Sequence, residues 1–231
     1  MTFLFPTTIV DNFLEDPDSL ADYAEGLDFC RGAANYPGRR TDYLNNLSVD
    51  LYEYISSKIL SIFYQQDPTY RISMQFQKID PLSEDKWNMK NRGWVHQDKG
   101  DLFGGILYLN KNPDPDSGTS IYSKKSEWKL FSKQNKLLTA KEKLYEEEFN
   151  SWSHPFYEKT HLDDESFEKI YSAYHDRFEE TLYVKNVYNR LFLFDGRQYH
   201  GVKTYGDRQR LTLAFFCKAI TGSGTYPLRR V

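Results

Sequence analysis

The alternation of apolar and polar residues predicts a mainly β protein. Residues 70–77 (Tyr-Arg-Ile-Ser-Met-Gln-Phe-Gln) alternate strictly, and a two-residue period is typical of a strand with one apolar and one polar face. Short apolar runs predict further strands at residues 7–10, 106–110, 119–122, 181–187, 190–194, 199–203 and 210–219. The aromatic content of 16% agrees with this, because aromatic side chains favour the pleated surface of a sheet.

Two helices are predicted near the N-terminus. Asp16 stands at an N-cap position and Pro17 at the first helical position, and Gly26 follows the last turn, so the first helix runs to about Glu25. Ser48 caps a second helix, in which apolar side chains recur at helical spacing at Leu51, Ile55, Ile59, Leu60 and Phe63. We expect these helices to pack on the outside of the sheet.

The character of the chain changes between residues 123 and 180. This stretch is rich in Lys and Glu and has helical patterns at 139–152 and 163–178. We interpret it as a helical insertion between strands of one domain that comprises residues 1–231. An insertion in this place can cover the mouth of a site and select a substrate.

Composition narrows the class of protein. A net charge of −3 and a pI near 6.0 argue against a dedicated nucleic-acid binder. Cys30 and Cys217 are too few for a disulfide framework, so we expect two buried thiols in a reducing compartment. The chain has neither a signal-peptide pattern at its start nor an apolar run long enough to span a membrane. We therefore expect a cytoplasmic protein that does not act at a membrane.

Three residues suggest a metal site. His96 and Asp98 are two apart, so on a strand their side chains point to the same face. A second histidine on a facing strand, His200, would complete two imidazoles and one carboxylate on one side of a metal. That facial arrangement leaves coordination positions open and suits non-haem Fe(II), which must also hold oxygen and a co-substrate.

A basic residue begins the last predicted strand. Arg210 and Thr212 share a face with Ala214 and Phe216, while the alternate residues of the strand are all apolar. An arginine at the start of an apolar strand is suited to binding a carboxylate, because its planar guanidinium can donate two parallel hydrogen bonds. Arg208, two residues earlier, is the alternative for this role.

The motifs His96-x-Asp98, a distant His200 and Arg210-x-Thr212 together resemble the Fe(II)- and 2-oxoglutarate-dependent dioxygenases, in particular the prolyl-hydroxylase-like branch or uncharacterised relatives of it. The resemblance covers roughly residues 70–218. It implies a double-stranded β-helix (jelly-roll) core with flanking helices. It also implies that His96, Asp98 and His200 bind iron and that Arg210, helped by Thr212, binds the distal carboxylate of 2-oxoglutarate. The sequence departs from the prolyl hydroxylases at Arg210, where they often have Lys.

The activity implied by this resemblance is hydroxylation of an amino-acid side chain, with release of succinate and CO2. Its requirements are Fe(II), 2-oxoglutarate and O2, with ascorbate as a further candidate. Whether the substrate is a peptide, a protein or a small molecule stays open, and so do the role of the insertion and the oligomeric state.

Further polar residues are candidates for contact with the co-substrate. Tyr108 and Asn110 share one strand face, and the Tyr108 hydroxyl can donate to a carboxylate if that face points inward. Gln77 occupies the polar face of residues 70–77 and is a third candidate. A row of solvent-facing polar side chains explains the same pattern. Arg39 and Arg40 follow a Pro-Gly turn, which indicates a solvated turn more readily than an anion site.

Two other classes of function remain open. A cupin-like metalloprotein would use the same two histidines and aspartate without 2-oxoglutarate. A non-catalytic jelly-roll binding module would carry these residues by coincidence. A hydrolase has less support, because no Gly-x-Ser-x-Gly motif accompanies the histidines.

Overall fold

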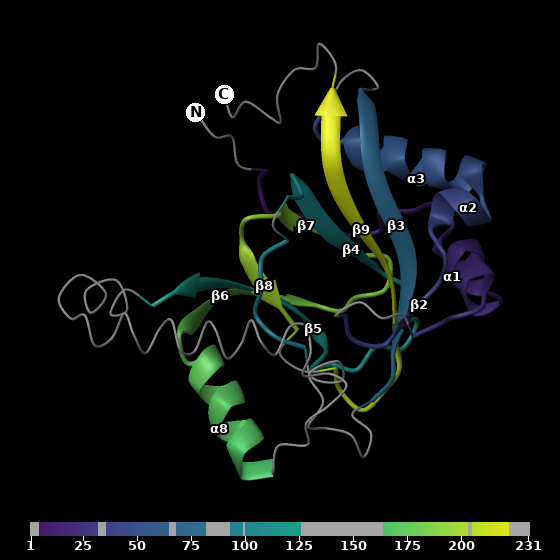
Figure 1. The fold of residues 1–231 in the computed structure, drawn as a ribbon. Coiled ribbons are helices and arrows are strands. Elements are labelled where there is room, and N and C mark those ends of the chain that lie inside the picture. Colours follow the sequence, from purple (N-terminus) through teal and green to yellow (C-terminus); the bar gives the residue numbers. More distant parts are fainter. Residues whose placement is uncertain are drawn as a thin grey trace.

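The fold consists of two antiparallel sheets, with the N-terminal helices on one side of the larger sheet and a further helix close to the smaller sheet (Figure 1). The computed structural model describes residues 5–31, 36–64, 68–81, 93–98, 100–125, 164–202 and 205–221. In spatial order the larger sheet contains β1 (Thr8–Val10), β7 (Leu191–Asp195), β4 (Phe103–Tyr108), β9 (Arg210–Thr221), β3 (Thr69–Ile79) and β2 (Arg39–Arg40). The smaller sheet contains β6 (Phe178–Lys185), β5 (Gly118–Lys124) and β8 (Tyr199–Gly201).

Strands β3 and β9 are neighbours in the larger sheet and pair along almost their whole length. The register places Gln77 opposite Thr212 and Ile79 opposite Arg210. The alternation of residues 70–77 is therefore that of a strand, as predicted, although β3 extends beyond both ends of the predicted stretch. This register brings the polar end of β3 beside the basic end of β9.

The two predicted N-terminal helices begin where their capping residues predict, and the first also ends at Gly26 as predicted. Helix α1 spans Pro17–Glu25, and the side chain of Asp16 accepts a hydrogen bond of 3.0 Å from the amide of Ser19. Helix α2 is a single turn at Leu44–Leu47. Helix α3 spans Val49–Leu60, and Ser48 caps it by accepting from the amide of Leu51. None of the helices in the described part of the chain is long and apolar enough to cross a membrane.

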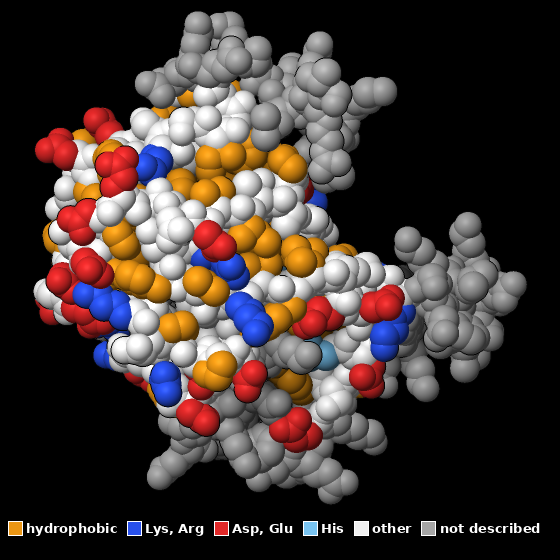
Figure 2. All heavy atoms as spheres, turned by 180° about the vertical axis from the view of Figure 1, so that it is seen from behind, with side chains coloured by type: hydrophobic (Ala, Val, Ile, Leu, Met, Phe, Trp, Pro, Cys, Tyr) orange, Lys and Arg blue, Asp and Glu red, His pale blue; other side chains and the backbone are white. Residues whose placement is uncertain are grey.

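The main hydrophobic core lies between these helices and the larger sheet. Ile55, Ile59 and Leu60 of α3 are buried in one cluster with side chains of β3, β4, β7 and β9. A second, smaller cluster lies where the two sheets meet and contains Tyr108, Ile121, Val184, Phe192 and Phe194. Strands β4 and β7 of the larger sheet thus contribute side chains to both clusters. Figure 2 shows the molecule from behind, where charged side chains, many of them acidic, gather on the side of the helices.

Helix α8 (Asp164–His175) lies in the predicted insertion, between β5 and β6 in the sequence. The prediction placed this helix at 163–178, but it ends earlier because β6 begins at Phe178 and pairs with β5. The predicted helix at 139–152 lies outside the described residues, as does the C-terminal tail after residue 221.

The two cysteines differ in their surroundings. Cys217 is buried in the main core, and burial raises the pKa of its thiol to about 12. The prediction that Cys30 is buried is wrong: Cys30 is exposed, because it forms an isolated bridge with Arg40 at the edge of the larger sheet. Both are free thiols.

Candidate metal centre and its cavity

His96 and His200 lie side by side rather than on facing strands. The amide of His96 donates to the carbonyl of His200 at 2.8 Å, and the amide of His200 donates back at 2.9 Å. His96 therefore forms a one-residue extension of the smaller sheet beside β8. The expectation of a facing strand is corrected here: reciprocal backbone hydrogen bonds bring the two rings to a centroid separation of 4.4 Å.

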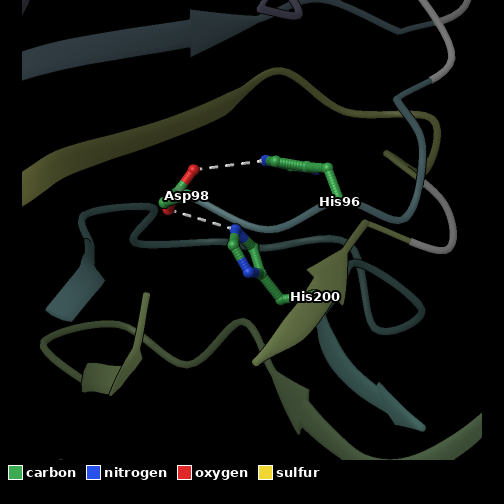
Figure 3. A group of neighbouring side chains, drawn as sticks. All are labelled: His96, Asp98 and His200. Atoms are coloured by element: carbon green, nitrogen blue, oxygen red, sulfur yellow. Dashed lines mark ion pairs between the residues drawn. The ribbon is translucent and has the colours of Figure 1, made fainter. Parts of the chain in front are cut away.

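Asp98 completes a compact group with the two histidines (Figure 3). Its Oδ1 lies 3.6 Å from His96 Nε2, and its Oδ2 lies 3.3 Å from His200 Nε2. One potential ligand atom from each residue lies within 4.8 Å of the others. Asp98 Oδ2 is buried and has no hydrogen bond of good geometry. A buried carboxylate oxygen in this state has unused capacity to bind a cation.

Backbone carbonyl groups orient both imidazole rings. His96 Nδ1 lies 3.0 Å from the carbonyl oxygen of Trp94, and His200 Nδ1 lies 3.0 Å from that of Gln198. A carbonyl can only accept, so the proton of each neutral ring belongs on Nδ1 and the lone pair on Nε2. Both Nε2 atoms face Asp98 (Figure 3). A hydrogen bond from the ring nitrogen that does not face the metal to a carbonyl group is typical of histidines that bind metal ions.

The electrostatic environment keeps the donor atoms in the state that a metal needs. Burial, followed by the neighbouring His200, lowers the pKa of His96 to about 4, so this ring is neutral at pH 7. Burial by itself would raise the pKa of Asp98, but His200, His96 and Arg40 together lower it below its usual value. A neutral imidazole and an ionised carboxylate are the forms that coordinate metals.

The donor set suits Fe(II). Two imidazole nitrogens and one carboxylate come from one side, and the group lines a cavity of about 260 Å³. Two histidines and one carboxylate with open positions are typical of non-haem Fe(II) sites that use oxygen, whereas structural zinc sites enclose the metal with four protein ligands. The residues present therefore fit a catalytic metal with room for a second ligand.

The cavity also contains two residues predicted to bind the co-substrate, Arg210 and Gln77. Arg210 is 2% exposed, and its Nη1 and Nη2 donate to the carbonyl of Gly118 at 2.9 Å and to Thr119 Oγ1 at 3.0 Å. Its Nε is buried without a partner, and Arg210 forms no ion pair with a carboxylate within the described part of the chain. A buried charge without a counter-ion is costly. Arg210 is therefore placed to receive an anion.

The other predicted co-substrate residues lie behind or beside the cavity. Tyr108 donates to Thr119 Oγ1 at 2.9 Å, and its ring lies 5.2 Å from the Arg210 guanidinium. Thr212 is buried on the Arg210 face of β9. The Asn110 amide group binds the backbone of Gln209 and Leu211, outside the cavity lining. Direct contact of these three residues with the co-substrate stays a prediction. Arg208, the alternative to Arg210, is exposed.

Arg40 is the main addition that the structure makes to the predicted site. The sequence favoured a solvated turn for Arg39 and Arg40, and this holds for Arg39, which pairs with Asp80 on the surface. Arg40 instead lines the cavity, with its guanidinium 4.0 Å from the centre of the Tyr36 ring. The alternation of side chains along β2 directs neighbouring residues to opposite sides. In the sequence, the Pro-Gly turn before the two arginines was the feature that could have indicated a role for Arg40 in the site.

Glycine provides the space that Asp98 occupies. A Cβ atom at Gly104 would lie 3.0 Å from Asp98 Oδ2 and 3.4 Å from the Phe194 ring. The contact of 3.0 Å would force the carboxylate to shift by a few tenths of an ångström. The absence of a side chain at this position of β4 therefore sets where the Asp98 carboxylate lies.

Helix α8 holds the segment that leads into His96. The hydroxyl of Tyr171 donates to the carbonyl of Gly93 at 2.9 Å, and that of Tyr174 donates to the carbonyl of Val95 at 2.5 Å. Between these carbonyls lies Trp94, whose own carbonyl orients the His96 ring. The insertion is thus in direct contact with the backbone of the candidate metal centre.

Solved structures share this fold at low sequence identity. HygX from Streptomyces hygroscopicus, with nickel, 2-oxoglutarate and hygromycin B bound, superposes with a TM-score of 0.52 at 13% identity, over 91% of this chain and 82% of HygX. The complex of HygX with nickel and 2-oxoglutarate gives 0.51 at the same identity and coverage. A prolyl-4-hydroxylase from Pseudomonas putida gives 0.45 at 14% identity, over 91% of each chain. The likeness to HygX shows a common fold.

Sequence comparison identifies the family. No curated protein matches the chain. The model of a family described as a family of unknown function (DUF6445) matches residues 5–209, which is most of the 231 residues. The chain therefore belongs to the DUF6445 family.

Proposed function

We propose that this protein is an Fe(II)- and 2-oxoglutarate-dependent oxygenase that hydroxylates an amino-acid side chain. One observation carries the proposal: a cavity of about 260 Å³ contains both the group His96, Asp98 and His200 and the buried guanidinium of Arg210, which has no carboxylate partner among the described residues. A metal site beside a separate cation is what a bound keto acid with a second carboxylate requires. The fold shared with HygX, whose structures contain nickel and 2-oxoglutarate, supports the proposal.

The three candidate ligands hold the metal in this proposal. The carbonyl groups of Trp94 and Gln198 fix the rings, and Gly104 leaves space for the Asp98 carboxylate. When bound, Fe(II) with 2-oxoglutarate and O2 supplies the oxidising chemistry that inserts oxygen into a C–H bond and yields succinate and CO2. The protein binds, orients and shields the reactants. The apolar lining from Ile106, Ala214 and Phe216 excludes water.

Arg210 binds the distal carboxylate of 2-oxoglutarate in this proposal. Gly118 and Thr119 hold its guanidinium in place, and Tyr108 supports Thr119 from behind. This pre-organisation reduces the loss of side-chain entropy on binding. In a cupin-like metalloprotein that does not use 2-oxoglutarate, Arg210, a buried arginine without a carboxylate partner among the described residues, would have no function in the cavity. In a non-catalytic binding module, the oriented histidines would have no function.

We further propose that the two sheets form a double-stranded β-helix within one domain, with the insertion as its cover. The two contacts from α8 to residues 93–95 support this arrangement. A cytoplasmic location and a prolyl-hydroxylase-like substrate are parts of the same proposal. The substrate follows from the sequence resemblance, and the location follows from the two free cysteines, which suit a reducing compartment.

The test is thermal unfolding of the purified protein with and without Ni(II) and 2-oxoglutarate, in the absence of oxygen. A ligand at 100 times its dissociation constant stabilises the native state by about 2.7 kcal/mol. For a domain of this size we expect Tm to rise by roughly 5–10 °C, at about 2–4 °C for each kcal/mol. The His200→Ala variant should lose the shift, and wild-type protein with Fe(II) and air should convert 2-oxoglutarate to succinate.

Other outcomes separate the alternatives. If the metal raises Tm but 2-oxoglutarate gives no further increase, the protein would be a cupin-like metalloprotein. If none of Fe(II), Ni(II), Mn(II) and Zn(II) raises the Tm of the wild-type protein, the result would contradict the proposed metal site.

A further inference from the structure

The cavity contains a second cation that the proposed function does not use. Arg40 lines the same cavity as the candidate metal centre, on the strand next to Gln77. Its Nε is buried without a hydrogen-bond partner, and its guanidinium forms no ion pair with the described residues. Burial lowers the pKa of Arg40, and the nearby Tyr36 and Asp98 oppose this change. The Arg40 side chain is therefore a partly buried cation whose Nε is shielded from water and which has no counter-ion among the described residues.

Two aromatic rings contact the Arg40 guanidinium. Its central carbon lies 4.0 Å from the centre of the Tyr36 ring and 5.6 Å from that of Phe216. Stacking of this kind uses the flat faces of a guanidinium and leaves the N–H groups at its edge for hydrogen bonds. Backbone hydrogen bonds between Arg40 and Cys30 fix the strand that carries it. The geometry is that of a prepared anion site.

Charge balance shows that 2-oxoglutarate alone does not neutralise the cavity. The charged residues among the described residues of the lining are Arg40, Arg210 and Asp98. With a divalent metal and neutral histidines the site carries three net positive charges, and the 2-oxoglutarate dianion removes two. One positive charge remains. A further anion is therefore expected in the complete complex, because an isolated charge at low dielectric is unfavourable.

We propose that Arg40 binds a carboxylate of the substrate to be oxidised, so that the substrate presents a free carboxylate on a small residue, either as a free amino acid or at the C-terminus of a peptide. The inference rests on the proposed function, since it assigns 2-oxoglutarate to Arg210 and leaves Arg40 to the substrate. At about 260 Å³ the cavity is below the roughly 300–1,000 Å³ typical of ligand sites. A free amino acid and the C-terminal residue of a peptide both present the required carboxylate next to a side chain.

The chain offers a matched pair of variants for the test. Arg40→Gln removes the cation in the cavity, whereas Arg39→Gln removes the neighbouring cation, which pairs with Asp80 on the surface. The probes are each proteinogenic amino acid as the free acid, the same amino acid as its C-terminal amide, and tripeptides ending in that residue. Each is added to protein that contains Ni(II) and saturating 2-oxoglutarate without oxygen. Tm and the dissociation constant are measured.

We expect at least one free acid or peptide carboxylate to bind and its amide not to bind. Arg40→Gln should weaken that binding roughly 10- to 100-fold, the range for lost hydrogen bonds to a charged group, and Arg39→Gln should leave it unchanged. Comparison of amino acid and tripeptide identifies the source of the carboxylate. In the Arg40→Gln variant, 2-oxoglutarate should still raise Tm as it does in the wild type.

Three results would overturn the inference. The first is that no acid binds more tightly than its amide, and the second is that Arg40→Gln binds the acid as the wild type does. The third is that Arg40→Gln loses 2-oxoglutarate itself, which would assign Arg40 to the co-substrate and leave the proposed function intact. Failure of the wild type to bind 2-oxoglutarate with metal is a different result, and it contradicts the proposed function.

Discussion

The two faces of strand β9 differ although they alternate residue by residue. Leu211, Leu213, Phe215 and Cys217 are buried in the main hydrophobic core. Arg210, Ala214 and Phe216 line the cavity, together with Arg40 and the candidate metal ligands, and the Nε atoms of both arginines are buried without a hydrogen-bond partner. The first face is arranged for stability. The second keeps polar groups unsatisfied, a state that is favourable only when a ligand is bound.

The largest expected effect is on the core face. Phe215→Ala should destabilise the protein by about 3–5 kcal/mol, because it removes a fully buried ring and leaves a cavity. Phe216→Ala, one residue later and half-buried at the cavity, should cost clearly less and should weaken substrate binding instead. Urea unfolding of both variants measures the difference. Equal losses of stability would contradict the division of the two faces.

The second-largest effect is expected at Arg210, the residue proposed to bind the distal carboxylate of 2-oxoglutarate. Arg210→Gln should weaken 2-oxoglutarate binding roughly 10- to 100-fold, corresponding to about 1.5–3 kcal/mol for hydrogen bonds to a charged group. Arg208→Gln should have little effect, because Arg208 is exposed and contacts the backbone of Asn112. Titration calorimetry with Ni(II)-loaded protein measures both. The reverse order would transfer the role to Arg208.

A smaller effect is expected at Gly104. In Gly104→Ala the new Cβ atom would lie 3.0 Å from Asp98 Oδ2, so the carboxylate must move by a few tenths of an ångström. We expect metal affinity to fall about 10-fold, at the lower end for changes that reorient a ligand. Gly26→Ala is the control, since its Cβ would meet no atom closer than 3.6 Å. Unchanged metal affinity in Gly104→Ala would show that Asp98 does not need its present position.

The smallest effect is a change in acid stability. Asp195 is fully buried at the end of β7; burial alone would raise its pKa, but hydrogen bonds from Arg197 and the amide of Phe5 lower it. A carboxyl with a lowered native pKa stabilises the fold above its unfolded-state pKa, and this contribution is lost as pH falls through the native value. Below about pH 4, Asp195→Asn should therefore lose less stability per pH unit than the wild type. The measurement is the free energy of unfolding of both proteins as a function of pH. If it falls equally steeply in both below about pH 4, the lowered pKa is not that of Asp195.

Local signals in the sequence determined the elements and the identity of the main site residues. Asp16, Pro17 and Ser48 define helix starts by hydrogen-bond geometry that involves only neighbouring residues. The alternation along residues 70–77 and 210–217 defines which side chains share a face, because the period of a strand is two. His96, Asp98 and His200 were recognisable by their types and context, and the structure brings them together.

Tertiary structure alone decided which strands are neighbours. His96 and His200 are paired by reciprocal backbone hydrogen bonds between distant segments, so their rings approach from one sheet and not from facing strands. Arg39 and Arg40 are alike in sequence. The pairing of β2 with β3 places Arg40 in the cavity and leaves Arg39 at the surface with Asp80. Spacing along a chain fixes relative directions within one strand, whereas the register between strands depends on long-range contacts.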